Sequence, residues 1–264
     1  MANETEATAT QPDWALVANR EMVDGGPRYT ETPPDPFAPE ARFPAEPWNA
    51  ATASLFIVLV GVWWWRLRGR YREYPFLCFC LPILLAGGIG GTLYHATRTS
   101  FTLFLLDVLP ISILGLAGAV FMAVRFWGRG GWWFVPGATA FYIGVNRLLF
   151  VSLDPGKTLA VNLSYASLAL VILTPITLVL VRTKFRHGGW IVTGFVAFVI
   201  AWFMRLVDLR VGWMLPMGSH WLWHIFGCVA TAFVIEYFYR VEGETADGAV
   251  NERSTKQARS AGTG

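Results

Sequence analysis

Long apolar runs follow one another along most of this chain, separated by short polar connections. From residue 48 onward, seven runs reach the length that a helix needs to cross a bilayer, about 20 residues. The runs are 48–65, 74–97, 101–124, 131–152, 158–181, 188–208 and 219–240. They are continuous rather than alternating, and a backbone in lipid must satisfy its own hydrogen bonds, so helices are favoured over strands. The pattern predicts an all-α membrane protein, a bundle of seven transmembrane helices.

Two segments outside these runs differ in composition. Residues 1–47 hold nine of the 18 acidic residues and many prolines, which predicts an acidic, proline-rich N-terminal segment. No basic start leads there into a short apolar core, so we expect no cleavable signal peptide. Residues 241–264 are mostly small, polar or charged, which predicts a disordered tail. The remaining residues, 48–240, form the transmembrane domain.

Basic residues in the connections predict the orientation of the bundle. They gather after the first, third, fifth and seventh runs: Arg66, Arg68, Arg70, Arg72, Arg125, Arg129, Arg182, Lys184, Arg186 and Arg240. The opposite connections hold only Arg98, Lys157 and Arg210. Because basic loops stay on the cytoplasmic side, we expect the N-terminus outside and the C-terminus in the cytoplasm. This arrangement suits a bacterial inner membrane, or an endoplasmic reticulum or Golgi membrane.

Composition narrows the class of protein. The 264 residues are 54% hydrophobic and 15% charged, whereas an average soluble domain is about a quarter charged. This excludes a disordered chain, a collagen-like fibre and an ordinary cytosolic enzyme. The net charge of +3 is not gathered into a basic block, which argues against a nucleic-acid partner. Three cysteines, Cys78, Cys80 and Cys228, lie in apolar runs and are interpreted as small hydrophobic residues.

Four ionisable side chains fall at one depth of the predicted bundle. His95 ends the second helix, Asp107 lies about two turns into the third, and His220 and His224 begin the seventh. In the predicted topology all four lie in the outer half of the bilayer. Each such residue costs about 2.5–3.5 kcal/mol on insertion scales, so a shared site is a physical reason for their presence.

The spacing of two histidines suits a metal ligand pair. His220 and His224 are separated by four residues, which puts both imidazoles on one helix face. Such a pair at a helix start is also typical of interfacial side chains, but His95 at matching depth favours a zinc ion. Three imidazoles with one open position form the pattern of catalytic zinc.

The other polar residues of the outer half have alternative interpretations. Asp107 either activates a water at the zinc as a general base or pairs with Arg98 or Arg147 in a structural salt bridge. Arg205 and Asp208 lie three residues apart and can pair on one helix face. A structural role and contact with lipid headgroups both stay open for Arg147, Arg205 and Asp208.

Four short motifs, in the family's order, resemble those of the alkaline ceramidases. This family belongs to a superfamily of seven-helix hydrolases (CREST) that includes the progestin and adiponectin receptors. Glu46–Asn49 resembles the family's Glu-Phe-Trp-Asn, and Gly91–Thr97 resembles Ser-x-x-Phe-His-Ala-Thr. Leu105–Pro110 resembles Leu-Leu-Asp-Glu-Leu-Pro, and His220–Ile225 resembles His-Ala-Trp-Trp-His-Ile. Each motif is short, but four in order on the expected helices are specific.

The resemblance implies an activity and a set of roles. The implied activity is a zinc-dependent amidase that cleaves ceramide, or a related lipid amide, to a sphingoid base and a fatty acid inside the membrane. His95, His220 and His224 would hold the zinc, and Asp107 would activate the water. The substrate would be a membrane lipid that enters sideways between apolar helices.

Two positions depart from the family pattern. The family serine four residues before the first histidine is Gly91 here, and losing one oxyanion donor typically costs 10²–10³ in rate. Thr92 is our candidate for the missing catalytic hydroxyl, with Ser219 or a water as alternatives. Of the family's calcium ligands only Asp13 and Glu46 match, and calcium requires six to eight oxygens, so we do not expect calcium in the family manner.

Three functions are compared on these grounds. A zinc amidohydrolase is the first. A receptor-like seven-helix protein, with structural zinc and slow or no turnover, is the alternative that Gly91 favours. A metal transporter has the least support, because no chain of polar residues continues into the cytoplasmic half of the predicted helices.

Overall fold

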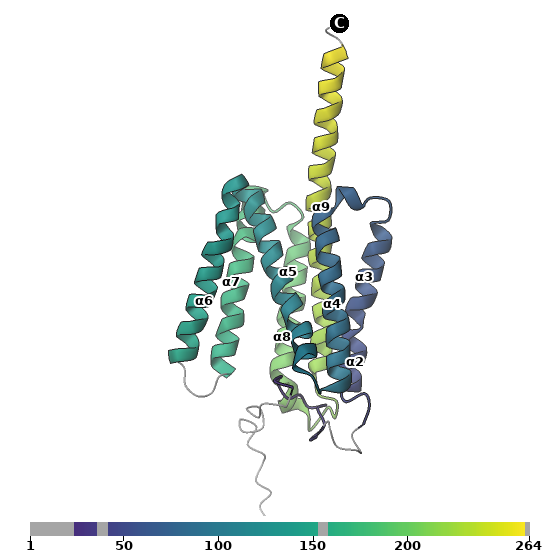
Figure 1. Ribbon diagram of the computed structural model, residues 1–264, viewed down its shortest axis with the longest axis vertical. Coiled ribbons are helices and arrows are strands. Elements are labelled where there is room, and N and C mark those ends of the chain that lie inside the picture. The colour runs from purple at the N-terminus through teal and green to yellow at the C-terminus, as the bar shows by residue number, and fades with distance from the viewer. Residues whose placement is uncertain (1–23, 36–41, 153–157, 262–264) are drawn as a thin grey trace, which may run out of the picture.

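Helices and short connections make up the described chain. The computed structural model describes residues 24–35, 42–152 and 158–261, and no β-strand occurs among them. The helices are α2 (Pro47–Ala53), α3 (Leu55–Arg66), α4 (Pro75–Thr97), α5 (Phe101–Trp127), α6 (Phe134–Ser152), α7 (Thr158–Arg182), α8 (Gly188–Val211) and α9 (His220–Ala261) (Figure 1). Two 3-10 turns accompany them, η1 (Tyr71–Glu73) and η2 (Gly128–Trp133). The predicted all-α class is confirmed for these residues.

Several helices have the length and composition of membrane spans. Five stretches of the described chain qualify: Pro47–Arg66, Pro75–Thr97, Phe101–Leu149, Gly188–Val211 and His220–Glu244. The first joins α2 to α3, and the third runs through α5, η2 and much of α6. A shorter apolar helix covers Ala166–Arg182 in α7. These are the features of a helical membrane protein, as the apolar runs predict.

The connection between α4 and α5 is short, and local backbone features define where α4 ends and α5 begins. Arg98 follows α4 in the left-handed conformation (φ 54°), which stops the helix directly after the turn that carries His95. Ser100 caps α5, because its hydroxyl accepts the Leu103 N–H at 3.5 Å. The C-terminal end of α4 therefore lies beside the N-terminal end of α5.

Glycines allow α4 and α5 to pack closely. A Cβ at Gly90 would lie 2.8 Å from the backbone carbonyl atoms of Leu106, and one at Gly87 would lie 3.0 Å from the Cβ of Pro110. Small residues at such an interface let helix backbones approach one another in a membrane. This contact brings the part of α5 that carries Asp107 against α4.

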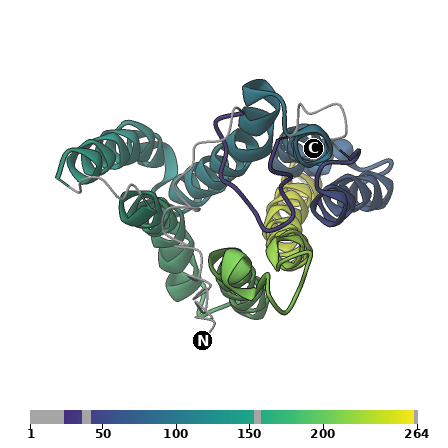
Figure 2. The same cartoon turned by 90° about the horizontal axis from the view of Figure 1, so that it is seen from below.

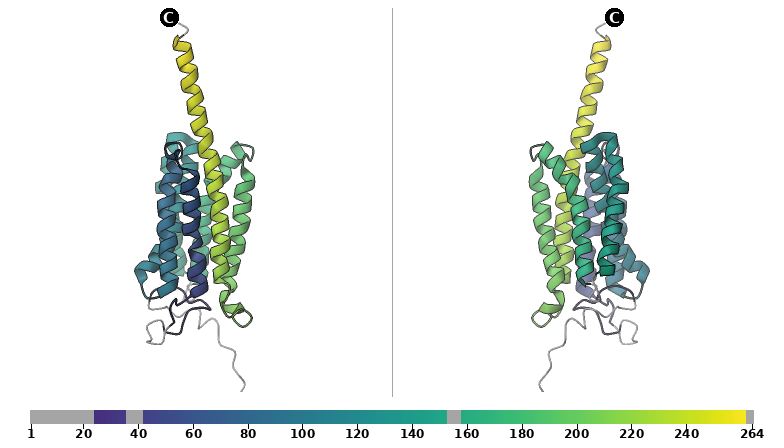
Figure 3. Two further views of the ribbon diagram at one scale, coloured as in Figure 1. Left: turned by 90° about the vertical axis from the view of Figure 1, so that its right-hand side faces the viewer. Right: turned by 90° about the vertical axis from the view of Figure 1, so that its left-hand side faces the viewer.

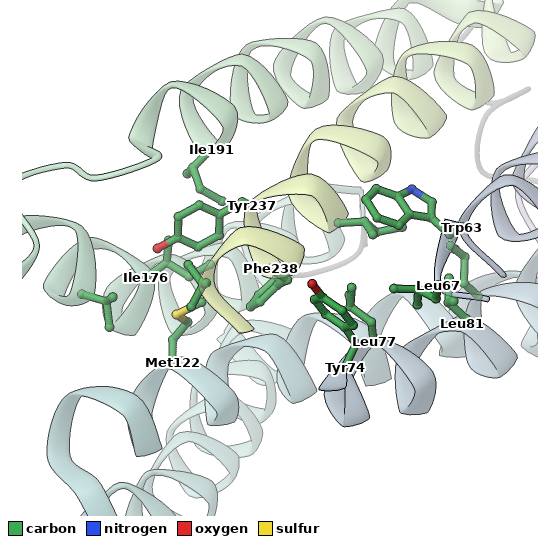
Figure 4. Close-up of a cluster of buried hydrophobic side chains, with 14 of the residues drawn as sticks. Trp63, Leu67, Tyr74, Leu77, Leu81, Met122, Ile176, Ile191, Tyr237 and Phe238 are labelled. Atoms are coloured by element: carbon green, nitrogen blue, oxygen red, sulfur yellow. The ribbon is translucent and has the colours of Figure 1, made fainter. Parts of the chain in front are cut away.

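An apolar cluster holds the other end of the bundle (Figure 4). It joins α3, α4, α5, α7, α8 and α9 through Trp63, Leu67, Tyr74, Leu77, Leu81, Met122, Ile176, Ile191, Tyr237 and Phe238. At the same end Glu236 receives hydrogen bonds from Arg66 (2.5 Å) and Arg240 (2.8 Å). The contact of Glu236 with arginines agrees with their predicted clustering at this end. The helices are thus fixed to one another away from the histidines.

The last helix is longer than the sequence pattern predicts. Residues from 241 were expected to form a disordered tail, but α9 continues to Ala261 and projects beyond the other helices (Figures 1 and 3). Val241 and Glu242 are buried, and the Glu242 carboxylate accepts the N–H groups of Phe76 (2.6 Å) and Leu77 (3.3 Å). These contacts carry the helix past residue 240.

We predict that Gly90→Ala destabilises the bundle, because its methyl group would force the backbones of α4 and α5 apart. Overpacking of this kind costs about 1–3 kcal/mol. Gly61→Ala is the matched control, since a Cβ at Gly61 meets nothing within 4 Å. The thermal unfolding midpoint in detergent micelles should fall for Gly90→Ala alone. Equal midpoints for the two variants would contradict the close approach.

Candidate metal centre

Three histidines from two helices meet at one end of the bundle. His95 lies in the last turn of α4, and His220 and His224 lie in the first two turns of α9. One ligand nitrogen from each lies within 4.8 Å of the others, and all three residues are at most 3% exposed. The ring centroids of His95 and His224 are 4.8 Å apart, as are those of His220 and His224. The structure thus brings together the three histidines that the sequence analysis selected.

One ring nitrogen of each of the three histidines lacks a protein partner. His95 Nε2, His220 Nδ1 and His224 Nε2 are buried and have no hydrogen-bond partner in the described part of the chain. Buried polar atoms are nearly always paired, so three orphans in one place require an explanation such as a shared ion. Three imidazole nitrogens are the ligand set of a catalytic zinc site with one position open. The residues present therefore fit a divalent metal ion.

Glu46 fixes the tautomer of the first histidine. Its Oε2 accepts the His95 Nδ1–H at 2.5 Å, which leaves Nε2 of that ring free to bind a metal. Glu46 also accepts hydrogen bonds from Thr32 (2.5 Å), Asn49 (3.0 Å) and Arg98. Burial alone would raise the pKa of Glu46, but the hydrogen bond from His95 and the charge of Arg98 lower it to about 2. The carboxylate is therefore ionised and fully hydrogen-bonded.

The structure gives Glu46 a role that the sequence analysis did not assign. The family resemblance groups Glu46 with Asp13 as a match to calcium ligands, whereas in the structure the bonds of Glu46 go to Thr32, Asn49, His95 and Arg98. Asp13 lies outside the described residues. This orienting role of Glu46 could not be inferred from the sequence, because Glu46 and His95 are 49 residues apart and nothing in the pattern shows that they lie side by side.

Asp208 fixes the first turn of the helix that carries the other two histidines. Its Oδ1 accepts the N–H groups of Ser219 (2.6 Å) and His220 (2.7 Å) at the start of α9. A carboxylate at a helix N-terminus satisfies unpaired N–H groups and interacts favourably with the helix dipole.

The two other polar residues of the predicted outer half are Arg205 and Arg147. Arg205 lies over the ring of Trp223, with 5.5 Å between its Cζ and the ring centroid. Arg147 is exposed on α6.

A segment of the N-terminal region covers this end of the bundle. We call residues 24–32 the N-terminal strap; Figure 2 looks onto this end and shows the strap crossing it. Tyr29 stacks on His220 with 3.6 Å between ring centroids, and its centroid lies 5.7 Å from that of His95. Burial raises the pKa of Tyr29 above its usual range, so its hydroxyl is protonated at neutral pH. Sequence reasoning missed Tyr29, because the segment has no periodic pattern.

Asp107 lies beside the histidines, against the backbone of α4. Its Oδ1 occupies the place where a Cβ at Gly91 would lie, and its Cγ is 3.5 Å from that point. Gly91 is one helical turn before His95 on α4, so the Asp107 carboxylate lies in the same part of the bundle as the three histidines. The five hydrogen bonds of the Arg98 guanidinium group go to other groups, which disfavours the structural Arg98–Asp107 pair.

The two candidate hydroxyls are engaged with backbone carbonyls. Thr92 donates its hydroxyl to the carbonyl of Gly88 at 2.7 Å, and Ser219 donates its hydroxyl to that of Met204 at 2.6 Å. Neither hydroxyl is offered to a substrate in this arrangement.

The whole site consists of three unpartnered histidine nitrogens, an acid beside them and an aromatic ring over one of them. Such a set can hold a divalent ion and can pass a proton between a water and a leaving group. Comparisons of the chain with protein-family models, with curated proteins and with solved structures find no match.

We predict that Glu46→Gln weakens zinc binding about 10- to 100-fold, because partners of this kind typically contribute that much to metal affinity. The variant keeps the side chain's size but loses the charge that holds the His95 Nδ1–H. A competition titration with a chromophoric zinc chelator on protein in micelles measures the affinity. Glu73→Gln is the control, since Glu73 forms an exposed pair with Arg70. Unchanged affinity in Glu46→Gln would contradict the orienting role.

Proposed function

We propose that this protein is a zinc-dependent hydrolase that cleaves the amide bond of ceramide or a related lipid amide within the membrane. The observation that carries the proposal is the meeting of three buried, unpartnered imidazole nitrogens at one end of an apolar helical bundle. The resemblance of four motifs to the alkaline ceramidases supports the choice of an amide substrate. The products would be a sphingoid base and a fatty acid.

The residues take distinct roles in this reaction. His95, His220 and His224 would hold the zinc, and Glu46 keeps the first of them aligned. Bound zinc lowers the pKa of a water to about 7 and polarises the amide carbonyl. Asp107 takes a proton from the attacking water as its oxygen adds to the carbonyl carbon, and the proton then passes to the amine nitrogen as the C–N bond breaks.

The same proposal includes the topology. We infer seven spans, the first made by α2 with α3 and the others by α4 to α9 in turn, with the N-terminus outside and the C-terminus in the cytoplasm. The basic residues support it, because Arg66 and Arg70 pair with residues of α9 far from its histidines. The site would then lie beneath the outer headgroups, where a lipid amide is found. The setting would be a bacterial inner membrane, or the endoplasmic reticulum or Golgi.

A receptor-like protein with slow or no turnover is the second candidate. It is favoured by Gly91, which stands where the ceramidases have a serine, and by the hydroxyls of Thr92 and Ser219, which bond to the backbone. In that case the metal would hold α4 and α9 together rather than take part in catalysis.

We predict that the purified protein contains zinc and releases fatty acid from ceramides or other lipid amides. Asp107→Asn should lower the rate about 10²- to 10⁴-fold while zinc content is kept, because it removes the proton acceptor and no ligand. His220→Ala should lower both rate and zinc content. Glu73→Gln is the control and should behave as the wild type. Zinc retained without turnover in the whole lipid panel would favour the receptor-like function, and absence of bound zinc would overturn the metal site.

We predict that Gly91→Ser lowers turnover although it adds the hydroxyl that the ceramidases have. The new Cβ would displace the Asp107 carboxylate, and a misplacement of about 1 Å in a catalytic group can cost about 10²-fold. Zinc affinity should stay unchanged. Gly137→Ser is a matched control, since a Cβ there meets nothing within 4 Å. Faster turnover in Gly91→Ser would show that the missing hydroxyl limits the rate and that the Asp107 contact does not.

A further inference from the structure

Arg98 is a fully buried cation that the proposed chemistry does not use. Its side chain is 0% exposed and makes five hydrogen bonds, one for each N–H of the guanidinium group. Nε and Nη2 bond the two carboxylate oxygens of Asp24 at 2.7 and 3.3 Å. Nη2 also bonds the carbonyl of Pro27 at 2.9 Å, and Nη1 bonds Thr32 at 3.0 Å and the Glu46 carboxylate.

The partners of Arg98 fall into two groups. Asp24, Pro27 and Thr32 belong to the N-terminal strap, whereas Glu46 precedes α2 and holds the ring of His95. Removing an arginine between two buried carboxylates would leave both without their shared counter-charge, which is strongly unfavourable. Arg98 therefore connects the strap to a metal ligand through one intervening side chain.

A second connection ties the strap to the other ligands. Asp208 Oδ2 accepts the Thr30 N–H at 2.7 Å, while Oδ1 of the same carboxylate accepts the N–H of His220. Between the two connections, Tyr29 stacks on the His220 ring. The strap is thus bonded to Arg98, which follows α4, and to Asp208 of α8, whose carboxylate also binds the first turn of α9.

We propose that Arg98 is a positioning residue that couples closure of the N-terminal strap to metal affinity at His95, His220 and His224. The inference rests on the proposed metal site. Because coupling between two equilibria is reciprocal, a strap held by Arg98 tightens metal binding, and bound metal in turn holds the strap closed. A residue that only stabilised the fold would change neither of these relationships.

The chemistry of arginine makes a graded test possible. Lysine keeps the charge but has three donors on a flexible stem and cannot reproduce the planar set of five. Arg98→Lys should therefore keep the fold while loosening the bonds of this side chain to the strap and to Glu46. Asp24→Asn acts on the strap side alone, because Asp24 bonds the guanidinium group at Nε and Nη2, whereas the Glu46 carboxylate bonds it at Nη1.

The experiment measures zinc affinity and trypsin cleavage on the full chain in micelles. Cleavage after Arg28, in the half-buried part of the strap, is followed by the mass of the released fragment with and without zinc. Wild type should be cleaved more slowly with zinc. Arg98→Lys should bind zinc about tenfold more weakly, and zinc should protect Arg28 less. Asp24→Asn should shift both readouts in the same direction by a smaller factor.

The controls separate this inference from the proposed function. Arg70→Lys makes the same exchange at the opposite end of the bundle, where Arg70 pairs with Glu73, and should match wild type in both readouts. Absence of zinc binding in wild type overturns the metal site itself. Zinc binding by wild type and by both variants with equal affinity, or zinc protection of Arg28 that the variants leave unchanged, overturns the role of Arg98. If Arg98→Lys does not fold, Asp24→Asn decides the matter alone.

Discussion

Three buried imidazole nitrogens without protein partners, gathered at one end of the bundle, impose a strong constraint on this structure. Each would cost free energy if it stayed unpaired, and no proton donor of the described chain points at them. A divalent cation satisfies all three at once. The ends of α4 and α9 must be held within ångströms of each other for this to happen, and the surrounding contacts are those that such placement requires.

Two carboxylates hold the ligands in place. Glu46 aligns the ring of His95, and Asp208 fixes the backbone at His220, so each ligand-bearing helix has its own acidic support. The N-terminal strap lies between these supports and is bonded to both. The apolar cluster lies at the far end of the bundle, where it sets the spacing of the helices without touching the polar site.

The parts that could be predicted from the sequence are those with a regular pattern. Apolar runs gave the positions of α4, α5, α8 and the first part of α9, because helices in lipid must be continuous and apolar. The i, i+4 pair His220 and His224 was visible in the sequence, and alternation of helix direction was enough to bring His95 to the same end. Asp107 was found for the same reason.

The parts that could not be predicted depend on contacts between segments without a pattern. Tyr29 reaches the site as part of the strap, whose path is set by hydrogen bonds rather than by periodicity, and Arg98 reaches it through Glu46. Gly91 was interpreted as a missing hydroxyl, whereas the structure shows that it leaves room for the Asp107 carboxylate. The end of α9 was missed because Glu242 binds the backbone of α4, a contact that local composition does not reveal.

X-ray absorption at the zinc edge of the purified protein tests the three-histidine site most directly. We expect one zinc per chain, with three imidazole nitrogens at about 2.0–2.1 Å and one further light ligand. Changing any one of His95, His220 and His224 to alanine should remove one imidazole from the spectrum or the metal from the protein. A zinc shell containing sulfur, or a spectrum unchanged by these substitutions, would contradict the three-histidine site.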